Sequence, residues 1–190
     1  MKINEIFYSL QGEGYFSGTP AVFIRLSGCN LKCTFCDTQH EDGRVMTEAE
    51  IIEQIKHYPT KHVIITGGEP SLQLTTEFVG LLHDNGYFVQ VETNGTRTLP
   101  SNVDWITCSP KSAPVVHNAV NEIKLVYEPG GSPEAIRRAL SIKADQYYLQ
   151  PCDVGDKAKN AHIIAECIDY IKSNPCWRLS LQTHKILNIR

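Results

Sequence analysis

Three closely spaced cysteines are the residues of this chain that most clearly suggest chemistry. Cys29, Cys33 and Cys36 follow the pattern C-x-x-x-C-x-x-C, directly after a short apolar segment. Three thiolates on one loop can ligate three irons of a [4Fe–4S] cluster and leave the fourth iron without a protein ligand. An iron with an open position can bind a small molecule and react with it. The spacing therefore predicts a catalytic iron–sulfur centre on a loop.

Two other metal centres compete with this interpretation. A structural zinc site has four protein ligands, usually in pairs, and an ordinary electron-transfer cluster is ligated by protein at every position. His40 is a candidate fourth ligand, but no second pair of cysteines follows downstream. Phe35, an aromatic residue just before the last cysteine, favours the catalytic interpretation.

A glycine-rich turn, Gly67-Gly68-Glu69-Pro70, follows the apolar segment 62–66. Glycine has no Cβ, so the backbone there can approach a bound ligand closely. Taken alone, such a turn is usually just a tight loop. Because it follows the cysteine loop, we expect the turn and that loop to form one ligand-binding site together.

Composition and charge restrict the location and the partners. The chain has a net charge of −3 without clusters of Lys and Arg, so we expect no nucleic-acid partner. No apolar run reaches the roughly 18 residues of a membrane helix, and the first residues lack the layout of a secretion signal. Seven cysteines, an odd number, favour metal binding in the reducing cytoplasm over disulfides. We expect a cytoplasmic protein with one domain, residues 1–190, and no membrane partner.

Short apolar strands alternate with amphipathic helices along the chain and must position these motifs. The expected strands are 3–8, 21–27, 62–66, 87–92, 104–108, 122–127, 146–150 and 177–182. Helices are expected after the capping box at Thr47, from about 75 to 85, after the cap at Ser132, and from Asn160 to Asn174. This alternation predicts an α/β fold with a parallel sheet.

Polar clusters follow nearly every expected strand at its C-terminal end, which is where barrel-like α/β folds build their active sites. Five polar residues also share one side of their strands, opposite the apolar side chains: Arg25, Glu92, Lys124, Gln150 and Gln182. Any one of them could simply face solvent on a half-exposed sheet. Together, with helices covering the outer face, they favour a curled sheet with a polar interior.

The cysteine loop resembles the radical S-adenosylmethionine (SAM) superfamily, whose signature matches Cys29, Cys33, Phe35 and Cys36. The resemblance implies a partial, open TIM-like (β/α) barrel with a [4Fe–4S] cluster on the three cysteines. It also implies SAM as cofactor, which chelates the open iron and is cleaved reductively to methionine and a 5′-deoxyadenosyl radical. The glycine-rich turn is the second mark of the superfamily and implies that Gly68 contacts the cofactor.

Further segments along the whole chain resemble the 7-carboxy-7-deazaguanine synthase family of queuosine biosynthesis. Residues 5–14 are similar to the substrate loop of that family. The resemblance implies substrate contacts by Leu10, Gln11, Gly12, Arg25, Thr66 and Arg190. Arg25 would bind the substrate carboxylate, a task that suits the forked guanidinium group. Arg190 follows a family-like C-terminal segment and stands where some relatives end in proline.

The same resemblance implies how the cofactors are held. The residues expected at SAM are Phe35, Cys36, Asp37, Gly68, Ser109, Pro110, Lys111, Gln150, Pro151, Cys152 and Asp153. The hydroxyl of Thr38 would ligate a Mg²⁺ ion that also touches the substrate. Mg²⁺ commonly takes one or two protein oxygens and keeps its waters, so a single hydroxyl ligand is reasonable.

The implied activity is conversion of 6-carboxy-5,6,7,8-tetrahydropterin to 7-carboxy-7-deazaguanine and ammonia by radical ring contraction. The resemblance also implies a flavodoxin or ferredoxin-type electron donor and a homodimer. Two alternatives stay open. A glycyl-radical enzyme activase shares the cysteine spacing but acts on a partner protein, and a non-catalytic iron–sulfur or zinc module would not cleave SAM.

Overall fold

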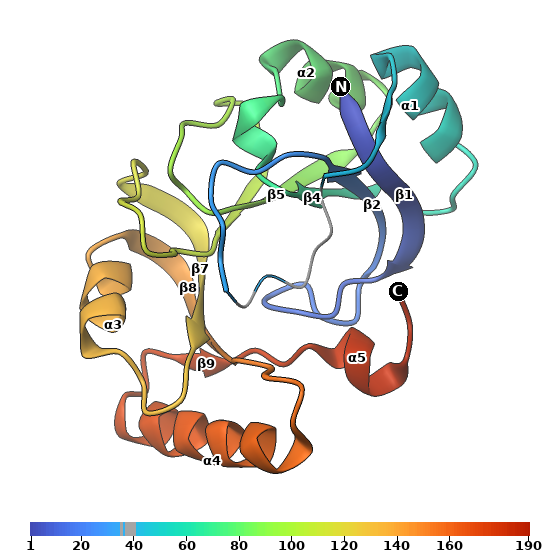
Figure 1. Ribbon diagram of the computed structural model, residues 1–190. Coiled ribbons are helices and arrows are strands. Elements are labelled where there is room, and N and C mark those ends of the chain that lie inside the picture. Colours follow the sequence, from blue (N-terminus) through green and yellow to red (C-terminus); the bar gives the residue numbers. More distant parts are fainter. Residues whose placement is uncertain (35, 37–40) are drawn as a thin grey trace.

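The computed structural model describes residues 1–34, 36 and 41–190. Within these ranges one sheet, in the order β3-β1-β2-β4-β5-β6-β7-β8-β9, curls around an open interior (Figure 1). Its strands are β1 (Lys2–Leu10), β2 (Pro20–Leu26), β3 (Arg44–Val45), β4 (His62–Gly67), β5 (Phe88–Thr93), β6 (Trp105–Cys108), β7 (Ala119–Tyr127), β8 (Lys143–Pro151) and β9 (Arg178–Leu179). The two edge strands do not meet, so the barrel is open.

Helices cover the outer face of this sheet (Figure 1). They are α1 (Glu48–Ile55), α2 (Thr76–Asp84), α3 (Pro133–Leu140) and α4 (Lys157–Ser173). The short 3₁₀ helix η1 (Pro70–Leu72) follows β4, and α5 (Thr183–Leu187) lies beside the open side of the barrel, near the C-terminus (Figure 1). No helix in the described part of the chain is long and apolar enough to cross a bilayer.

The prediction of a wholly parallel sheet was wrong at one edge. All neighbours from β2 to β9 are parallel, but β1 is antiparallel to both β2 and β3. Residues 11–19 join β1 to β2 without a helix, whereas parallel neighbours need a crossover of about a dozen residues or more. The loop 11–19 consequently lies at the N-terminal ends of the parallel strands. The cysteine loop lies at the opposite, C-terminal end of β2.

The helix starts follow the predicted capping signals. The box at Thr47 is complete: its hydroxyl accepts from Glu50 N at 3.2 Å, and Glu50 Oε2 accepts from Thr47 N at 2.7 Å. Ser132 caps α3. Helix α4 begins before the predicted Asn160, because Asp156 Oδ1 accepts two backbone N–H groups of the first turn at 2.9 and 3.0 Å.

Two apolar clusters fix the outer face of the sheet against the helices. One lies beneath α1 and α2 and includes Ile24, Ile51, Ile65, Phe78, Leu82 and Val91. The other lies beneath α3 and α4 and includes Ile123, Ile136, Leu149, Ile163 and Cys167. Complete burial of each large apolar side chain contributes about 1.5–3 kcal/mol. Since alternate residues of a strand point to opposite faces, the polar residues between them must face the interior.

Candidate active site

A cavity of about 720 Å³ occupies the interior of the curled sheet. All predicted site residues that the structure describes line this cavity, apart from Pro110, which is buried beside them. Phe35, Asp37, Thr38 and the alternative ligand His40 lie outside the described residues. The five polar residues predicted to share one side of their strands also line it, although Gln182 lies beyond β9, which ends at Leu179. A volume of this size is typical of a small-molecule site.

The three cysteines lie together at one end of the cavity. Cys29 and Cys33 are half-buried, Cys36 is exposed, and all three are free thiols. Burial raises the pKa of Cys29, the backbone N–H of Leu31 opposes this shift, and the charges of Glu69 and then of Cys33 and Cys36 add to it. Thiols that repel one another when ionised become stable thiolates when a cation binds between them.

Three thiols on one loop are the donor set that a [4Fe–4S] cluster with one open iron requires. In a [4Fe–4S] cluster each thiolate binds a different iron, so the sulfurs do not need to converge on one point. The residues therefore fit the predicted three-cysteine cluster.

The glycine-rich turn is packed against the start of the cysteine loop. A Cβ on Gly68 would lie 1.8 Å from Gly28 O, and one on Gly67 would lie 2.1 Å from Leu26 O. The backbones are joined by hydrogen bonds from Gly68 N to Leu26 O at 3.0 Å and from Glu69 N to Gly28 O at 2.8 Å. Glycine is thus required here so that the two loops can lie in contact.

Glu69 connects this turn to the end of β5. Its carboxylate is fully buried and accepts hydrogen bonds from Ser71 N at 3.0 Å, Thr93 Oγ1 at 2.7 Å and Asn94 N at 2.8 Å. The side chain of Asn94 in turn donates to Asn30 Oδ1 in the cysteine loop at 3.0 Å. A buried carboxylate with several donors holds its neighbours rigidly, so Glu69 positions the loop without reacting itself.

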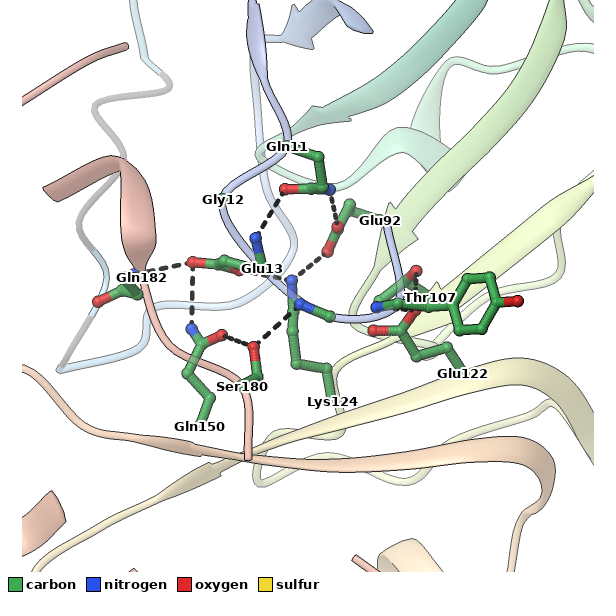
Figure 2. Close-up of polar contacts among 12 residues, drawn as sticks. Gln11, Gly12, Glu13, Glu92, Thr107, Glu122, Lys124, Gln150, Ser180 and Gln182 are labelled. Carbon is green, nitrogen blue, oxygen red and sulfur yellow. Dashed lines mark hydrogen bonds and ion pairs between the residues drawn. The ribbon is translucent and has the colours of Figure 1, made fainter. Parts of the chain in front are cut away.

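A buried charge network lies at the centre of the cavity (Figure 2). Lys124 Nζ lies 2.5 Å from Glu13 Oε2 and 2.7 Å from Glu92 Oε2. The second oxygen of Glu13 accepts from Gln150 Nε2 at 3.2 Å and Gln182 Nε2 at 3.0 Å. Gln11 Nε2 donates to Glu92 Oε1 at 3.1 Å, which ties the predicted substrate loop to β5.

The electrostatics of this network follow from its burial. Burial by itself raises the pKa of Glu13, but the charge and hydrogen bonds of Lys124 outweigh it and lower that pKa to about 2. Burial opposes the ammonium form of Lys124, yet the carboxylates of Glu13 and Glu92 raise its pKa. Glu13 and Lys124 therefore form a buried ion pair at neutral pH. Glu92 lies against the same ammonium group.

Arg25 and Arg190 meet at one carboxylate on the cavity wall. Arg25 Nε lies 2.8 Å from Glu5 Oε1, and the guanidinium of Arg190 pairs with the other oxygen of Glu5. Both guanidinium groups lie near the ring of Phe7, at 5.9 Å and 5.2 Å from its centroid. This corner of the cavity already accommodates a carboxylate between two arginines.

The remaining predicted cofactor residues are held at the strand ends. Ser109 N donates to Thr93 O at 2.8 Å, and burial lowers the pKa of Lys111. The carboxylate of Asp153 is engaged by Lys185 at 2.9 Å and by its own turn, which holds its pKa far below the usual range. Asp153 therefore shapes the rim of the cavity through these contacts.

Residues 23–142 match the sequence model of the radical SAM superfamily, so the chain belongs to that superfamily. A 7-carboxy-7-deazaguanine synthase from Bacteroides thetaiotaomicron is 52% identical over 190 residues and covers 100% of this chain and 98% of the relative. A 7-carboxy-7-deazaguanine synthase from Caulobacter vibrioides is 40% identical over 211 residues, covering 98% of each chain. The chain is thus a member of the 7-carboxy-7-deazaguanine synthase family, as its sequence predicted.

Solved structures agree with this assignment. The crystal structure of QueE from Escherichia coli is 31% identical, has a TM-score of 0.80, and covers 95% of this chain and 92% of that one. SuiB from Streptococcus suis, at 16% identity and a TM-score of 0.53, covers 83% of this chain and 47% of its own and shows a shared fold alone. The predicted fold class, a partial and open α/β barrel, is confirmed.

Several cavity residues were not among the predicted site residues: Glu5, Glu13, Glu92, Lys124, Gln182, His184 and Lys185. Strand parity had indicated that Glu92, Lys124 and Gln182 face inward, without giving them a role. Glu13 directly follows the predicted substrate residue Gly12, and that adjacency was the available signal. His184 contacts the same loop, since a Cβ on Gly12 would lie 2.3 Å from its Nδ1.

Proposed function

We propose that the protein converts 6-carboxy-5,6,7,8-tetrahydropterin to 7-carboxy-7-deazaguanine and ammonia, within queuosine biosynthesis. Full-length similarity to a synthase with 52% identity carries the proposal. The two products together contain the atoms of the substrate, so the reaction needs no net oxidant. Cys29, Cys33 and Cys36 would hold a [4Fe–4S] cluster, which with SAM bound would supply the radical chemistry for hydrogen abstraction at C6.

The described residues that face the cavity have the chemistry for binding this substrate. Arg25 pairs with a carboxylate in the structure, and we infer that the substrate carboxylate takes a place beside the same guanidinium. The backbone of the loop at Leu10, Gln11 and Gly12, together with Thr66, provides hydrogen-bonding groups for the edges of the pterin. The protein's contribution is to orient the substrate and to exclude water from reactive radicals.

The buried charges also suit the ring system. Glu13 and Glu92 place carboxylate oxygens at the cavity wall, where they can accept the N–H groups of an aminopyrimidine ring. Lys124 lowers the pKa of Glu13 and keeps that carboxylate ionised. We therefore assign the pterin ring to the end of the cavity near this network and the cofactor to the end near the cysteines.

The finer details are part of the same proposal. Thr38 would ligate Mg²⁺ next to the substrate, and the exposure of Cys36 lets a flavodoxin or ferredoxin-type donor approach the cluster. We also propose a cytoplasmic location, where reducing conditions keep the seven cysteines as thiols. A homodimer could use the exposed apolar residues Ile186 and Leu187 on α5. We also propose that residues 1–190 act as one domain built on the continuous sheet.

An anaerobic assay tests the function. The reconstituted protein, SAM, a chemical reductant and the carboxypterin are incubated together, and product is scored by mass. We expect a product whose mass equals that of the carboxypterin less ammonia. The Cys33→Ser variant should form no such product. SAM cleavage that is unaffected by the pterin and gives no deazaguanine would contradict the proposal and favour the activase alternative.

A further inference from the structure

Glu122 lies on β7 directly below the charge network and is 1% exposed. It shares a face of the strand with Lys124, two residues further on. Its Oε2 accepts hydrogen bonds from Tyr15 N at 3.3 Å and Trp105 Nε1 at 3.2 Å. It also accepts one from Thr107 Oγ1 at 3.4 Å (Figure 2). Its Oε1 is also buried and has no hydrogen-bond partner among the described residues.

Glu122 ends a row of polar contacts that crosses four neighbouring strands. His62 on β4 interacts through Nε2 with Gln90 Oε1 on β5 at 3.0 Å. Gln90 Nε2 donates to Thr107 Oγ1 on β6 at 3.2 Å, and this hydroxyl donates to Glu122 on β7. The row lies on the inner face, near the N-terminal ends of the strands. It forms the floor of the barrel beneath the cavity.

The loop 11–19 lies on this floor. Tyr15 stacks on Trp105 with centroids 4.9 Å apart, and Phe16 meets the rings of Trp105 and His62 edge-on at 4.9 and 4.8 Å. Gly14 has a positive φ of 65°, and a Cβ there would lie 2.0 Å from Glu122 Oε1. The backbone just after the substrate-contacting part of the loop is therefore fixed directly on the carboxyl group of Glu122.

We propose that Glu122 is a positioning residue for the substrate loop, holding Gly14 and Tyr15 from below and thereby setting residues 11–13 against the pterin. Glu122 is not one of the residues that line the cavity, so it acts through the loop. The inference rests on the proposed function only for the identity of the ligand. The contact between Glu122 and the loop does not depend on it.

The charge on Glu122 couples loop position to pH. Burial raises the pKa of Glu122 to about 7; Lys124 on the same strand opposes this, and Glu92 on β5 adds to it. Glu13 faces Lys124 from the loop, and His62 stands at the far end of the polar row. We call the loop seated when Gly14 and Tyr15 lie on Glu122, as in the structure. Because the seated loop helps to bury Glu122, it favours the protonated carboxyl group. Ionisation of Glu122 conversely favours a displaced loop that lets water reach the carboxylate. The loop is therefore held best below the ordinary carboxyl pKa of 4.5, and this contribution is lost as the pH rises to about 7 and beyond.

The substitution Glu122→Gln keeps the size and shape of the side chain and removes its charge. In Glu122→Gln the amide oxygen can accept the same three hydrogen bonds while the group stays neutral at every pH. If the raised pKa of Glu122 is due entirely to the seated loop, the equilibrium constant between the displaced and the seated loop depends on pH. In the wild type this constant falls by up to about tenfold between pH 6 and 8.5. The variant should show no such fall.

Fluorescence of the cofactor-free protein tests the contact. The chain has two tryptophans, so Trp177→Phe leaves Trp105 as the reporter. In that background we expect one fluorescence transition near pH 7 that Glu122→Gln abolishes. Glu134→Gln, at an exposed site on α3, is the matched control and should keep it. A transition that survives Glu122→Gln, or its absence in the parent, would overturn the inference.

Kinetics with the carboxypterin test the consequence. The wild-type KM should rise relative to that of Glu122→Gln by up to about tenfold between pH 6 and 8.5, with little change in the ratio of kcat values. Glu122→Ala removes the acceptor and should raise KM at every pH, whereas glutamine restores it. Parallel pH profiles would contradict the positioning role. If no variant turned over the pterin, the proposed function would fail while fluorescence would still decide the inference.

Discussion

Replacing Lys124 by methionine removes the cation at the centre of the buried charge network. The lysine side chain is 6% exposed and those of Glu13 and Glu92 are each 16% exposed. Methionine is also a long, unbranched side chain but has no charge. The variant therefore leaves two carboxylates facing each other in a water-poor interior.

The size of the effect can be estimated in two ways. Removing one partner of a buried ion pair typically costs about 3–5 kcal/mol in unfolding free energy. A pKa difference of one corresponds to about 1.4 kcal/mol, so the lowering of the Glu13 pKa from 4.5 to about 2 corresponds to about 3 kcal/mol net of burial. We expect Lys124→Met to lower the unfolding free energy by about 3–5 kcal/mol at pH 8.

The loss should depend on pH. In the wild type, the lowered pKa of Glu13 stabilises the fold above pH 4.5, and this contribution is lost as the pH falls toward 2. In Lys124→Met, the ammonium group no longer opposes the burial of Glu13, which then raises the pKa of that carboxyl group. The ionised carboxylate destabilises the fold most at high pH and becomes harmless as it protonates, so the difference in unfolding free energy from wild type should shrink between about pH 8 and pH 5.

Urea unfolding of the cofactor-free protein, followed by circular dichroism at both pH values, measures this difference. Lys159→Met, at an exposed site on α4, is the control and should stay within about 0.5 kcal/mol of wild type. A loss of equal size at both pH values would refute the electrostatic argument. So would a loss at pH 8 no larger than that of the control.

Three further substitutions test the site. Gly68→Ala forces a Cβ to within 1.8 Å of Gly28 O and should prevent cluster incorporation, which is seen as loss of visible absorbance. Gly80→Ala is the control, because a Cβ there meets no atom of another described segment within 4 Å, and it should retain the cluster. Equal incorporation in the two variants would contradict the packing argument. Arg25→Ala should raise the KM for the pterin about 10- to 100-fold while retaining uncoupled SAM cleavage; an unchanged KM would place the carboxylate elsewhere. Thr38→Ala should weaken the Mg²⁺ dependence of the rate, and an identical metal profile would count against this ligand.

Local signals in the sequence predicted much of the fold. Alternation along the strands correctly placed Glu92 and Lys124 on the inner face, because side-chain direction follows from strand geometry alone. Gln182 also lines the cavity, but the expected strand 177–182 is reduced to Arg178–Leu179 and Gln182 is the N-cap of α5. The cap at Ser132 likewise depends on neighbouring residues. The direction of β1 was missed, since a period of two is the same in parallel and antiparallel strands. Helix α5 was missed because it is five residues long and has no side-chain hydrogen bond at its N-cap.

The cavity was less predictable, because its contacts join distant parts of the chain. Glu13 and Lys124 are 111 residues apart, and no local pattern links them. The hydrogen bond from Tyr15 N to Glu122 similarly spans 107 residues. Resemblance to a known family supplied the cofactor and substrate residues, which periodicity could not have provided. It did not supply the residues that hold the substrate loop from below.

Electron paramagnetic resonance of the reduced, reconstituted protein tests most directly whether three thiolates leave one iron open. We expect a reduced [4Fe–4S] signal that changes when SAM is added, and loss of this signal in the Cys33→Ser variant. A signal that SAM leaves unchanged would mean that the protein itself occupies every iron, and a protein that binds no cluster would contradict the account altogether.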